Sequence, residues 1–357
     1  MVVLHICPLS DDLCNGVHIV VPLHVKAQQK YADAALWNLG HPINAEGINS
    51  YFTADDLAQL PSPYCKPDLA VFHEFYIPRY LSIAKQLDQL GIPYIILPHG
   101  ALKRTAQKKS RIKKIPANLL LFRRFCNNAV GIQCLTENEK AECVMGKNIF
   151  VAPNGINSPN QKKTVFHSDA TRFVYVGRIL PFIKGLDLMI EGFAKGKDYF
   201  AEHSATLDIY GPADDRGVSY LPEMNALIKK HGLNDLVKLH DAVIGEEKHK
   251  TLLDADVFVQ TSRTEGMPMG ILEALAYGMP CVITKGTTFA QQVEASGAGW
   301  DAGDNADSIA AALKKAVENR ARILDYSANA VKFSKGFDWD SAAKTALAAY
   351  SACLEKH

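Results

Sequence analysis

The densest group of residues that could do chemistry lies in the stretch 261–280. A short apolar run precedes it and a helical pattern follows it, so the chain turns a corner at Glu265–Gly270 and then opens a helix. The first amides of a helix have no partner within the helix, and with the helix dipole they suit a phosphate or the oxygens of a sugar. We therefore predict a ligand site formed by Glu265, Gly266, Met267, Met269 and Gly270.

A second carboxylate, Glu273, follows Glu265 by eight residues, or about two helical turns. One carboxylate can meet the ligand at the helix start while the other reaches a pair of hydroxyls. Nucleotide-binding proteins commonly hold the ribose hydroxyls with such a carboxylate. Two glutamates at this spacing occur often by chance, and it is the serine, glycines and prolines around them that make the pattern specific.

Two cations are predicted to join this site. Arg178 follows the apolar run 173–176, and Lys184 comes after a short loop, so both can reach the start of the next helix. A diphosphate needs such charges, because each charge-assisted hydrogen bond contributes roughly 1.5–3 kcal/mol when sheltered from water. By themselves the two residues would indicate an exposed pair on a solvated loop, and the glutamate stretch favours the phosphate contact.

The first half of the chain offers three further candidates. Asn15-Gly16 ends the first loop, and the Gly16 amide opens a helix where a phosphate can approach closely; a plain Asn-Gly turn is the alternative. His99 directly follows the apolar run 94–97, at the carboxyl edge of a predicted parallel sheet, where ligands bind. His73 ends the preceding apolar run in the same way, and we predict an acceptor contact or a strand cap for it.

Short apolar runs alternate with helical patterns along the whole chain, which predicts parallel sheets covered on both faces. A helix is expected over 17–30, broken early by Pro22, and the polar stretch 157–169 is the predicted linker between two halves of similar plan. The fold class is therefore α/β, with two doubly wound domains facing across a cleft. The main predicted strands are 2–6, 69–73, 94–97, 129–135, 149–152, 173–176, 205–210, 237–240, 257–260 and 281–283.

The amino-acid composition and net charge exclude several classes of protein. The 357 residues include 39 Lys+Arg and 38 Asp+Glu, a net charge of +1 that disfavours a nucleic-acid binder and an acidic disordered chain. A single hydrophobic core stops growing at roughly 250–300 residues, so a chain of 357 residues favours two domains. The eight cysteines show no zinc-finger spacing and indicate reduced thiols in a cytoplasmic protein. We expect neither a signal peptide nor a membrane span, since no apolar run approaches about 18 residues.

The glutamate stretch resembles the E-x7-E signature of retaining glycosyltransferases with the GT-B fold, in particular family 4. Val176-Gly177-Arg178 and Lys184-Gly185-Leu186-Asp187 are similar to the family's V-G-R…K-G-x-D block, and Ile209-Tyr210-Gly211 is similar to its strand-end glycine. The resemblance extends to Pro153-Asn154-Gly155-Ile156 at the domain junction and to Phe337-Asp338-Trp339 before a last helix that crosses back to the first domain.

The resemblance implies an acceptor-side domain over 1–160 with 337–357, and a donor domain over 168–336. It implies transfer of a hexosyl unit, with retention, from a nucleotide diphosphate sugar to a glycan or polyprenyl-diphosphate acceptor, as in bacterial surface polysaccharide synthesis. Glu265 then holds the donor sugar, His99 orients it, and the two cations hold the diphosphate. The family uses no metal or other cofactor, so the D-x-D strings at 254–256 and 338–340 are interpreted as structural.

Two departures from the family pattern leave details open. Asn15 stands where the family has glycine, and Leu239-His240-Asp241 replaces an aromatic-x-glycine near the base, so a UDP-sugar and a GDP-sugar both remain candidates. A GT-B nucleotide-sugar epimerase and a non-catalytic nucleotide-sugar-binding subunit are the alternative functions. An NAD dehydrogenase is disfavoured, because no G-x-G-x-x-G follows the first strand.

The stretch 102–125 carries nine positive charges and no acid. It indicates a surface for anionic lipid headgroups or a polyprenyl diphosphate, at the inner face of the plasma membrane, and the alternative is a solvated loop. Flotation with anionic vesicles at low salt distinguishes the two. The residues predicted to meet the acceptor or membrane are Asn15, His73, Lys103, Arg104, Lys108, Lys109, Arg111, Lys113 and Lys114.

Overall fold

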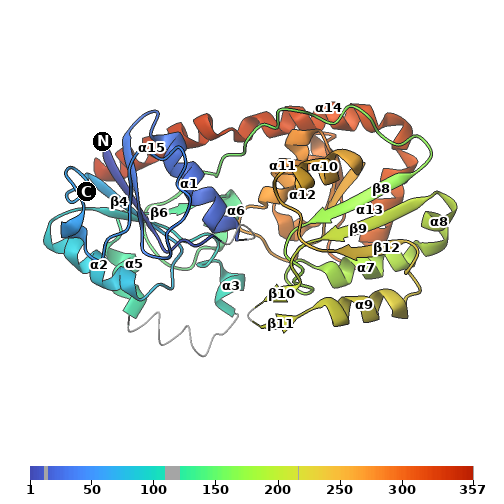
Figure 1. Ribbon diagram of the computed structural model, residues 1–357, viewed down its shortest axis with the longest axis horizontal. Helices are drawn as coiled ribbons and strands as arrows, with labels where there is room; N and C mark the ends of the chain where they lie inside the picture. Colours follow the sequence, from blue (N-terminus) through green and yellow to red (C-terminus); the bar gives the residue numbers. More distant parts are fainter. Residues whose placement is uncertain (12–14, 109–120, 216, 357) are drawn as a thin grey trace. The chain divides into compact units, whose positions relative to one another are not determined.

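A computed structural model describes residues 1–11, 15–108, 121–215 and 217–356. The chain forms two compact units (Figure 1). Unit 1 comprises Met1–Gly155 together with Trp339–His357, and unit 2 comprises Ile156–Asp338. The last helix is therefore part of unit 1, as the resemblance implied, although the whole of unit 2 precedes it in the chain.

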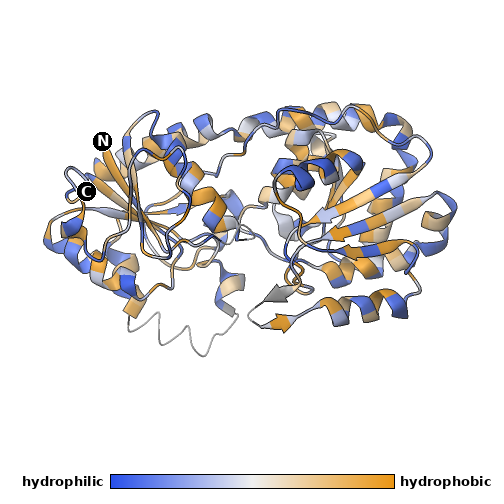
Figure 2. Cartoon of the chain, viewed as in Figure 1, coloured by the Kyte–Doolittle hydropathy of each residue, from blue (hydrophilic) through white to orange (hydrophobic). Residues whose placement is uncertain are grey.

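Unit 1 is built on a parallel sheet of seven strands in the order β3-β2-β1-β4-β5-β6-β7. The order reverses between β1 and β4, which places the crevice of a doubly wound fold at their carboxyl ends. Figure 2 shows the strands as predominantly hydrophobic. The strands are β1 (Val2–Cys7), β2 (Asp33–Asn38), β3 (Tyr51–Phe52), β4 (Leu69–His73), β5 (Tyr94–Leu97), β6 (Gly131–Cys134) and β7 (Ile149–Val151).

Helix α1 (Gly16–Gln28) runs unbroken through Pro22, so the predicted break there is wrong. Proline removes one helical hydrogen bond, but the same helix buries Val20, Val21 and Val25, and this apolar contact holds it. Helix α15 (Trp339–Leu354) packs along α1 (Figure 1). The other helices of unit 1 are η1 (Leu57–Gln59), α2 (Arg79–Gln89), α3 (Arg104–Lys108), α5 (Arg123–Asn128) and α6 (Glu137–Glu142).

Unit 2 has a parallel sheet of six strands in the order β12-β9-β8-β13-β14-β15, which reverses between β8 and β13. The small antiparallel pair β10 (Asp214–Asp215) and β11 (Val218–Ser219) stands apart from it. The sheet strands are β8 (Thr171–Val176), β9 (Ala205–Tyr210), β12 (Val237–His240), β13 (Val257–Gln260), β14 (Cys281–Ile283) and β15 (Gly299–Asp301).

Helices cover both faces of the unit 2 sheet. Alternate strand residues such as Phe173, Leu207 and Val257 form one apolar cluster with Phe193 and Phe200 from the helices. Helix α11 contacts β13, β14 and α14. The helices are α7 (Leu186–Lys195), α8 (Lys197–Glu202), α9 (Leu221–Lys230), α10 (Gly245–Asp254), α11 (Met269–Tyr277), η3 (Lys285–Thr287), α12 (Ala290–Ala295), α13 (Ala306–Glu318), η4 (Arg320–Arg322), α14 (Ile323–Ser334) and η5 (Lys335–Phe337).

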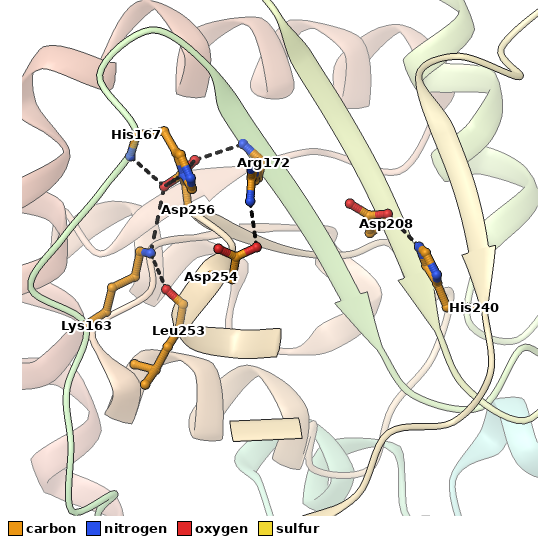
Figure 3. A network of polar contacts seen from close by, with 8 residues as sticks. All are labelled: Lys163, His167, Arg172, Asp208, His240, Leu253, Asp254 and Asp256. Carbon is orange, nitrogen blue, oxygen red and sulfur yellow. Dashed lines mark hydrogen bonds and ion pairs between the residues drawn. The ribbon is translucent and has the colours of Figure 1, made fainter. Parts of the chain in front are cut away.

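The stretch 157–169, predicted as a linker, is instead fastened to unit 2 (Figure 3). The Lys163 side chain is only 2% exposed, and its Nζ donates to the Leu253 carbonyl at 2.6 Å. Its backbone amide donates to the Tyr277 carbonyl at 2.8 Å. Burial lowers the pKa of Lys163, and the nearby Asp256 and Asp254 carboxylates partly offset that effect.

Asp256 is the buried centre of this attachment. Its carboxylate accepts hydrogen bonds from the backbone amides of His167 at 3.1 Å and Arg172 at 2.9 Å, and it lies 3.8 Å from Lys163 Nζ. Asp254 instead pairs at the surface with the Arg172 guanidinium at 2.6 Å. This D-x-D string therefore has the structural role predicted for it.

We expect Asp256→Ala to lower the free energy of unfolding by about 3–5 kcal/mol, because it strands a buried ammonium and two amides. Asp254→Ala is the matched control, since its 68% exposed side chain forms only a surface pair that contributes about 0–1 kcal/mol. Urea unfolding of the full chain measures both variants, and equal losses would contradict the assignment.

Candidate functional site

The predicted donor residues gather where β8, β9 and β13 end. These three strands are neighbours in the unit 2 sheet, and because they are parallel their carboxyl ends lie at one edge. The loop after β8 carries Arg178 and Lys184, the loop after β9 carries Gly211, and the loop after β13 carries Glu265. The structure therefore brings together residues that are up to 87 positions apart in the sequence.

Glycines let these loops approach each other. A Cβ atom at Gly211 would lie 1.8 Å from the Gly177 carbonyl oxygen, so no larger residue fits. Gly185, at φ 62°, directly precedes α7, and a Cβ atom there would lie 2.0 Å from the carbonyl oxygen of Thr261. The Thr261 hydroxyl donates to the Gly185 carbonyl at 2.7 Å. Packing therefore accounts for Gly211, and its predicted ligand contact stays a prediction.

Glu265 is the centre of the site. Its Oε1 accepts hydrogen bonds from Lys184 Nζ at 2.8 Å, Gln260 Nε2 at 2.8 Å and the Ser262 hydroxyl at 2.6 Å. Its backbone amide donates to the Gly286 carbonyl at 3.0 Å. The carboxylate is thus fixed in place, while Lys184 uses one of the three donors that an ammonium carries. The predicted sugar and phosphate residues lie in direct contact.

Arg178 belongs to the same neighbourhood. Its carbonyl accepts a hydrogen bond from the buried Tyr175 hydroxyl at 3.0 Å. Burial raises the pKa of Tyr175, the Glu265 carboxylate raises it further, and the Arg178 guanidinium lowers it. Arg178 and Glu265 thus follow the carboxyl ends of the neighbouring parallel strands β8 and β13.

The sequence did not reveal what holds the Lys184 loop. Arg263 donates through Nη1 and Nη2 to the two carboxylate oxygens of Asp187, at 2.7 and 2.8 Å. It also donates to the Phe182 carbonyl at 2.8 Å and lies 4.4 Å from the centroid of the Phe182 ring. This fork fastens the loop after β8 to the loop after β13. In the sequence, the K-G-x-D block singled out Asp187, but no motif marked Arg263 as its partner.

The start of α11 matches the predicted corner. The residue before the helix, Pro268, offers no side-chain cap, and Met267 is buried. A Cβ at Gly270 would find its nearest neighbour at an ordinary 3.4 Å, so the packing of unit 2 does not itself require glycine there. Farther along α11, Glu273 pairs with Lys248 of α10 at 2.6 Å, a partner that sequence reasoning missed.

Residues 239–241, which differ from the aromatic-x-glycine of the family, lie at the end of β12 (Figure 3). The His240 ring stacks on Tyr210 at a centroid distance of 4.3 Å, and His240 Nε2 lies 2.6 Å from the Asp208 carboxylate. Asp241 itself is exposed. At the end of β12, the His240 imidazole is therefore held in place by the Tyr210 ring and the Asp208 carboxylate.

In unit 1, His99 stands at the carboxyl end of β5, with its backbone in the left-handed region at φ 47°. Its Nε2 lies 3.2 Å from Nδ1 of His73. His73 is fully buried, and its Nε2 lies 2.9 Å from Nδ1 of His5. The prediction that His73 contacts an acceptor is therefore wrong, because no face of that ring reaches solvent; His73 contacts His99 instead.

Glu139 of α6 holds the turn that carries His99. One carboxylate oxygen accepts from the Gly100 amide at 2.6 Å, and the other accepts from the Leu135 amide at 2.7 Å. Burial raises the pKa of Glu139, and the Lys103 ammonium opposes that shift. Lys103 is only 3% exposed, so the prediction that it belongs to an acceptor or membrane surface is wrong.

The remaining basic candidates divide into two groups. Arg104 is exposed on α3. Lys109, Arg111, Lys113, Lys114 and the Lys108 side chain lie outside the described residues. Across the ranges that the structure describes, no helix is long and apolar enough to cross a membrane. The membrane surface therefore stays a prediction.

Asn15 caps α1, since its side chain accepts from the Val17 amide at 3.1 Å. A Cβ at Gly16 would meet nothing within 4 Å, so space does not require glycine there. Asn15 thus caps the helix, while its acceptor contact and the phosphate contact of Gly16 stay predictions. Over the described part of the chain, no group of three or more His, Cys, Asp or Glu is arranged to hold a metal ion.

Comparison with known proteins adds to this geometry. Residues 157–333 match the family model of the group 1 glycosyl transferases, and these residues contain Arg178, Lys184, Glu265 and Glu273. The match covers nearly the whole of the second unit, Ile156–Asp338. The recognition of a glycosyltransferase from its motifs is confirmed.

Curated relatives are similar over part of their length. The UDP-Gal:alpha-D-GlcNAc-diphosphoundecaprenol alpha-1,3-galactosyltransferase of Escherichia coli is 28% identical over 223 residues, 54% of this chain and 52% of the relative. The D-inositol 3-phosphate glycosyltransferase of Kineococcus radiotolerans is 25% identical over 199 residues, 53% of this chain and 46% of the relative. The chain thus spans about half the length of these relatives.

Solved structures resemble the whole chain. The sucrose-phosphate synthase of Thermosynechococcus elongatus has a TM-score of 0.76 at 15% identity, over 99% of this chain and 100% of that one. The Anabaena protein HepE in complex with UDP has a TM-score of 0.75 at 17% identity, over 99% and 100%. These likenesses confirm the predicted fold: two Rossmann-like units of the GT-B type.

The buried histidines predict how stability depends on pH. Burial lowers the pKa of His5 to about 4 and that of His24 to about 3. The unfolded chain binds protons on these rings below about pH 6.5, whereas the folded chain does not until far lower pH. The free energy of unfolding is therefore highest, as far as these rings are concerned, above about pH 6.5. It decreases as the pH falls below that value, by up to ~1.4 kcal/mol per pH unit for each ring.

Urea unfolding between pH 7 and 5 measures this dependence. We expect His24→Leu to flatten the slope by about 1 kcal/mol per pH unit. His41→Gln is the control, because His41 is exposed, and it should keep the slope of the unsubstituted protein. An unchanged slope in His24→Leu would contradict the prediction.

Proposed function

We propose that the protein transfers a hexosyl unit from a nucleotide diphosphate sugar to a glycan or lipid-linked acceptor, with retention at the anomeric carbon. The contact between Lys184 and Glu265 at the carboxyl edge of the unit 2 sheet carries this proposal. A cation and a carboxylate are in contact there, inside the region that matches the group 1 glycosyl transferases, which supports the proposal that they hold the diphosphate and the donor sugar.

The charges suit the departure of a nucleoside diphosphate. As the bond to the sugar breaks, negative charge grows on the diphosphate, so Arg178 and Lys184 stabilise the transition state more than the ground state. When the ligand enters, Lys184 donates a hydrogen bond to a phosphate oxygen through an N–H group that does not contact Glu265. Gln260 and Ser262 keep the Glu265 carboxylate in place, where it accepts hydrogen bonds from sugar hydroxyls.

Retention follows from attack on the face that the diphosphate leaves. A retaining hydrolase uses a carboxylate nucleophile about 5–5.5 Å from an acid, and we assign no such nucleophile to Glu265, whose Oε1 is held by three donors. In the proposed reaction the leaving diphosphate takes the acceptor proton, and neither a metal nor a cofactor takes part. Glu273 is proposed to hold the ribose, which requires it to share or release Lys248.

The relatives' names support the choice of substrates. HepE was solved with UDP and with UDP-glucose. The E. coli relative is named for UDP-Gal and a diphosphoundecaprenol-linked sugar. We therefore propose a UDP- or GDP-sugar as the donor and a glycan or polyprenyl-diphosphate-linked sugar as the acceptor.

We expect Lys184→Ala and Glu265→Ala each to slow transfer at least about 100-fold, since each removes a transition-state contact of roughly 3 kcal/mol. Lys195→Ala is the control, because Lys195 forms only a surface pair with Asp307 in the same unit. Release of nucleoside diphosphate in the presence of acceptor measures the rate, and circular dichroism verifies folding. Full activity in both site variants would contradict the proposal.

A ligand and product survey separates this function from its alternatives. Thermal shifts with UDP, GDP, ADP and their sugars identify the donor, because a ligand that binds only the folded state stabilises it. A glycoside with the donor's anomeric configuration supports the transferase, and full activity in EDTA supports metal independence. An epimerised nucleotide sugar indicates the epimerase, and binding without turnover of any acceptor indicates a silent subunit.

A further inference from the structure

One side chain, that of Arg263, holds the loop that carries Lys184 on both sides of that residue. Arg263 Nη1 donates to the carbonyl of Phe182, which precedes Lys184, at 2.8 Å. Nη1 and Nη2 also donate to the two carboxylate oxygens of Asp187, which follows Lys184 in the first turn of α7, at 2.7 and 2.8 Å. A single guanidinium therefore fixes both ends of the short segment 182–187.

The main chain of the same segment is attached to Arg263 as well. The Arg263 amide donates to the carbonyl of Ile183, directly before Lys184, at 3.1 Å. The Lys184 amide donates to the Leu180 carbonyl at 2.9 Å, which closes a turn. The main chain thus joins this turn to the loop after β13, and the Arg263 side chain completes the attachment at residues 182 and 187.

Arg263 can serve as an anchor because its own backbone is confined. It lies two positions before Glu265 on the loop after β13. The Thr284 hydroxyl donates to the carbonyl of the neighbouring Ser262 at 2.8 Å. A Cβ atom at Gly286 would lie 2.5 Å from the Arg263 carbonyl oxygen, and the Gly286 carbonyl accepts from the Glu265 amide at 3.0 Å. The loop after β14 therefore holds Arg263 and Glu265 together.

The contacts of Arg263 require the shape of an arginine. Its Cζ lies 4.4 Å from the centroid of the Phe182 ring, so the guanidinium covers the ring while its N–H groups reach Asp187. A lysine ammonium is a point charge without this planar fork. The Arg263 and Asp187 side chains are 27% and 29% exposed, so water screens their charges and the fork acts mainly through its geometry.

The hydrogen bonds also divide the work between the two cations. Arg263 gives three of the five N–H groups of a guanidinium to Phe182 and Asp187. Lys184 gives one of the three N–H groups of an ammonium to Glu265. Lys184 is therefore the cation that keeps most of its donors for a ligand, and Arg263 is the one that uses most of its donors on the protein.

We propose that Arg263 is a positioning residue, which holds Lys184 beside Glu265 before a ligand enters and so aims the remaining N–H groups of Lys184 at the diphosphate. A loop that is ordered in advance loses less conformational entropy when the ligand binds. The inference rests on the proposed function where it names the diphosphate, whereas the ordering of the loop can be tested without any ligand.

Hydrogen exchange of the full chain tests the ordering. We expect Arg263→Gln to speed exchange at least about 10-fold in peptides that cover 182–187, because a segment with fewer tertiary bonds opens more often. Arg172→Gln is the matched control, since Arg172 also pairs with an aspartate of unit 2, Asp254, and its side chain is 43% exposed. The control should exchange like the unsubstituted protein over these peptides. Unchanged exchange in Arg263→Gln would overturn the proposal.

Calorimetric binding of UDP and GDP separates positioning from attraction between charges. Asp187→Ala removes a negative charge from the Lys184 loop, so attraction alone predicts tighter binding of an anion. Positioning predicts the reverse, because Arg263 loses the partner that fixes one end of the segment. We expect Asp187→Ala and Arg263→Gln each to weaken binding about 3- to 10-fold. Tighter binding in Asp187→Ala would contradict the proposal.

A double-mutant cycle shows whether Arg263 acts through Lys184. Lys184→Ala removes the group that Arg263 positions, so adding Arg263→Gln to it should change the dissociation constant by less than about 2-fold. If Arg263 contacted the ligand directly, or if its loss loosened the whole of unit 2, the double variant would bind more weakly again by the full factor. That result would overturn the positioning role.

The conservative variant and the unsubstituted protein complete the test. Arg263→Lys keeps the positive charge but not the planar fork, so we expect it to exchange and bind like Arg263→Gln. Full recovery of binding in Arg263→Lys would show that the charge suffices and would contradict the proposal. If neither UDP nor GDP binds the unsubstituted protein, the proposed function and the diphosphate contact fail together, whereas hydrogen exchange still decides whether Arg263 orders the Lys184 loop.

Discussion

A polar group that is removed from water must be paired inside the protein, and this constraint organises both units. An unpaired buried donor or acceptor costs about 1–3 kcal/mol, and an unpaired charge costs more. Glu265 is accordingly held by three donors, Asp256 by two backbone amides, and Glu139 by two others. In each case a carboxylate joins segments that are far apart in the sequence, so the same bonds that satisfy it also fix the loops.

Much of the fold could be predicted, because buried parallel strands are continuous apolar runs. The strands β4, β5, β9 and β13 have the predicted bounds. β2 was not predicted, since Asp33–Asn38 is rich in alanine and leucine and has no strong strand signal, and β3 is only two residues long. The course of 157–169 also escaped prediction, because the bond from Lys163 to Leu253 joins residues 90 apart.

Some contacts of the candidate site could likewise be predicted from the sequence, and others could not. Glu265 and Lys184 follow strand ends, and a parallel sheet aligns such ends, so their meeting was foreseeable. The fork from Arg263 to Asp187 and the pair between Lys248 and Glu273 depend on side-chain directions that no local pattern records. Lys103 was misjudged for a related reason. A run of like charges indicates a solvated face only on average, and this member of the run is buried, where its charge lowers the pKa of the buried Glu139 on α6.

Helix α15 has a consequence for the order in which the protein is made. Its residues follow the whole of unit 2 in the chain, yet they belong to unit 1, where Tyr350 joins Gln133 and α15 covers α1. During synthesis on the ribosome, unit 2 is therefore the first to have all of its residues outside the exit tunnel. Unit 1 therefore waits with the α1 surface uncovered, and Gln133 lacks its bond from Tyr350, until the turns of α15 have also emerged.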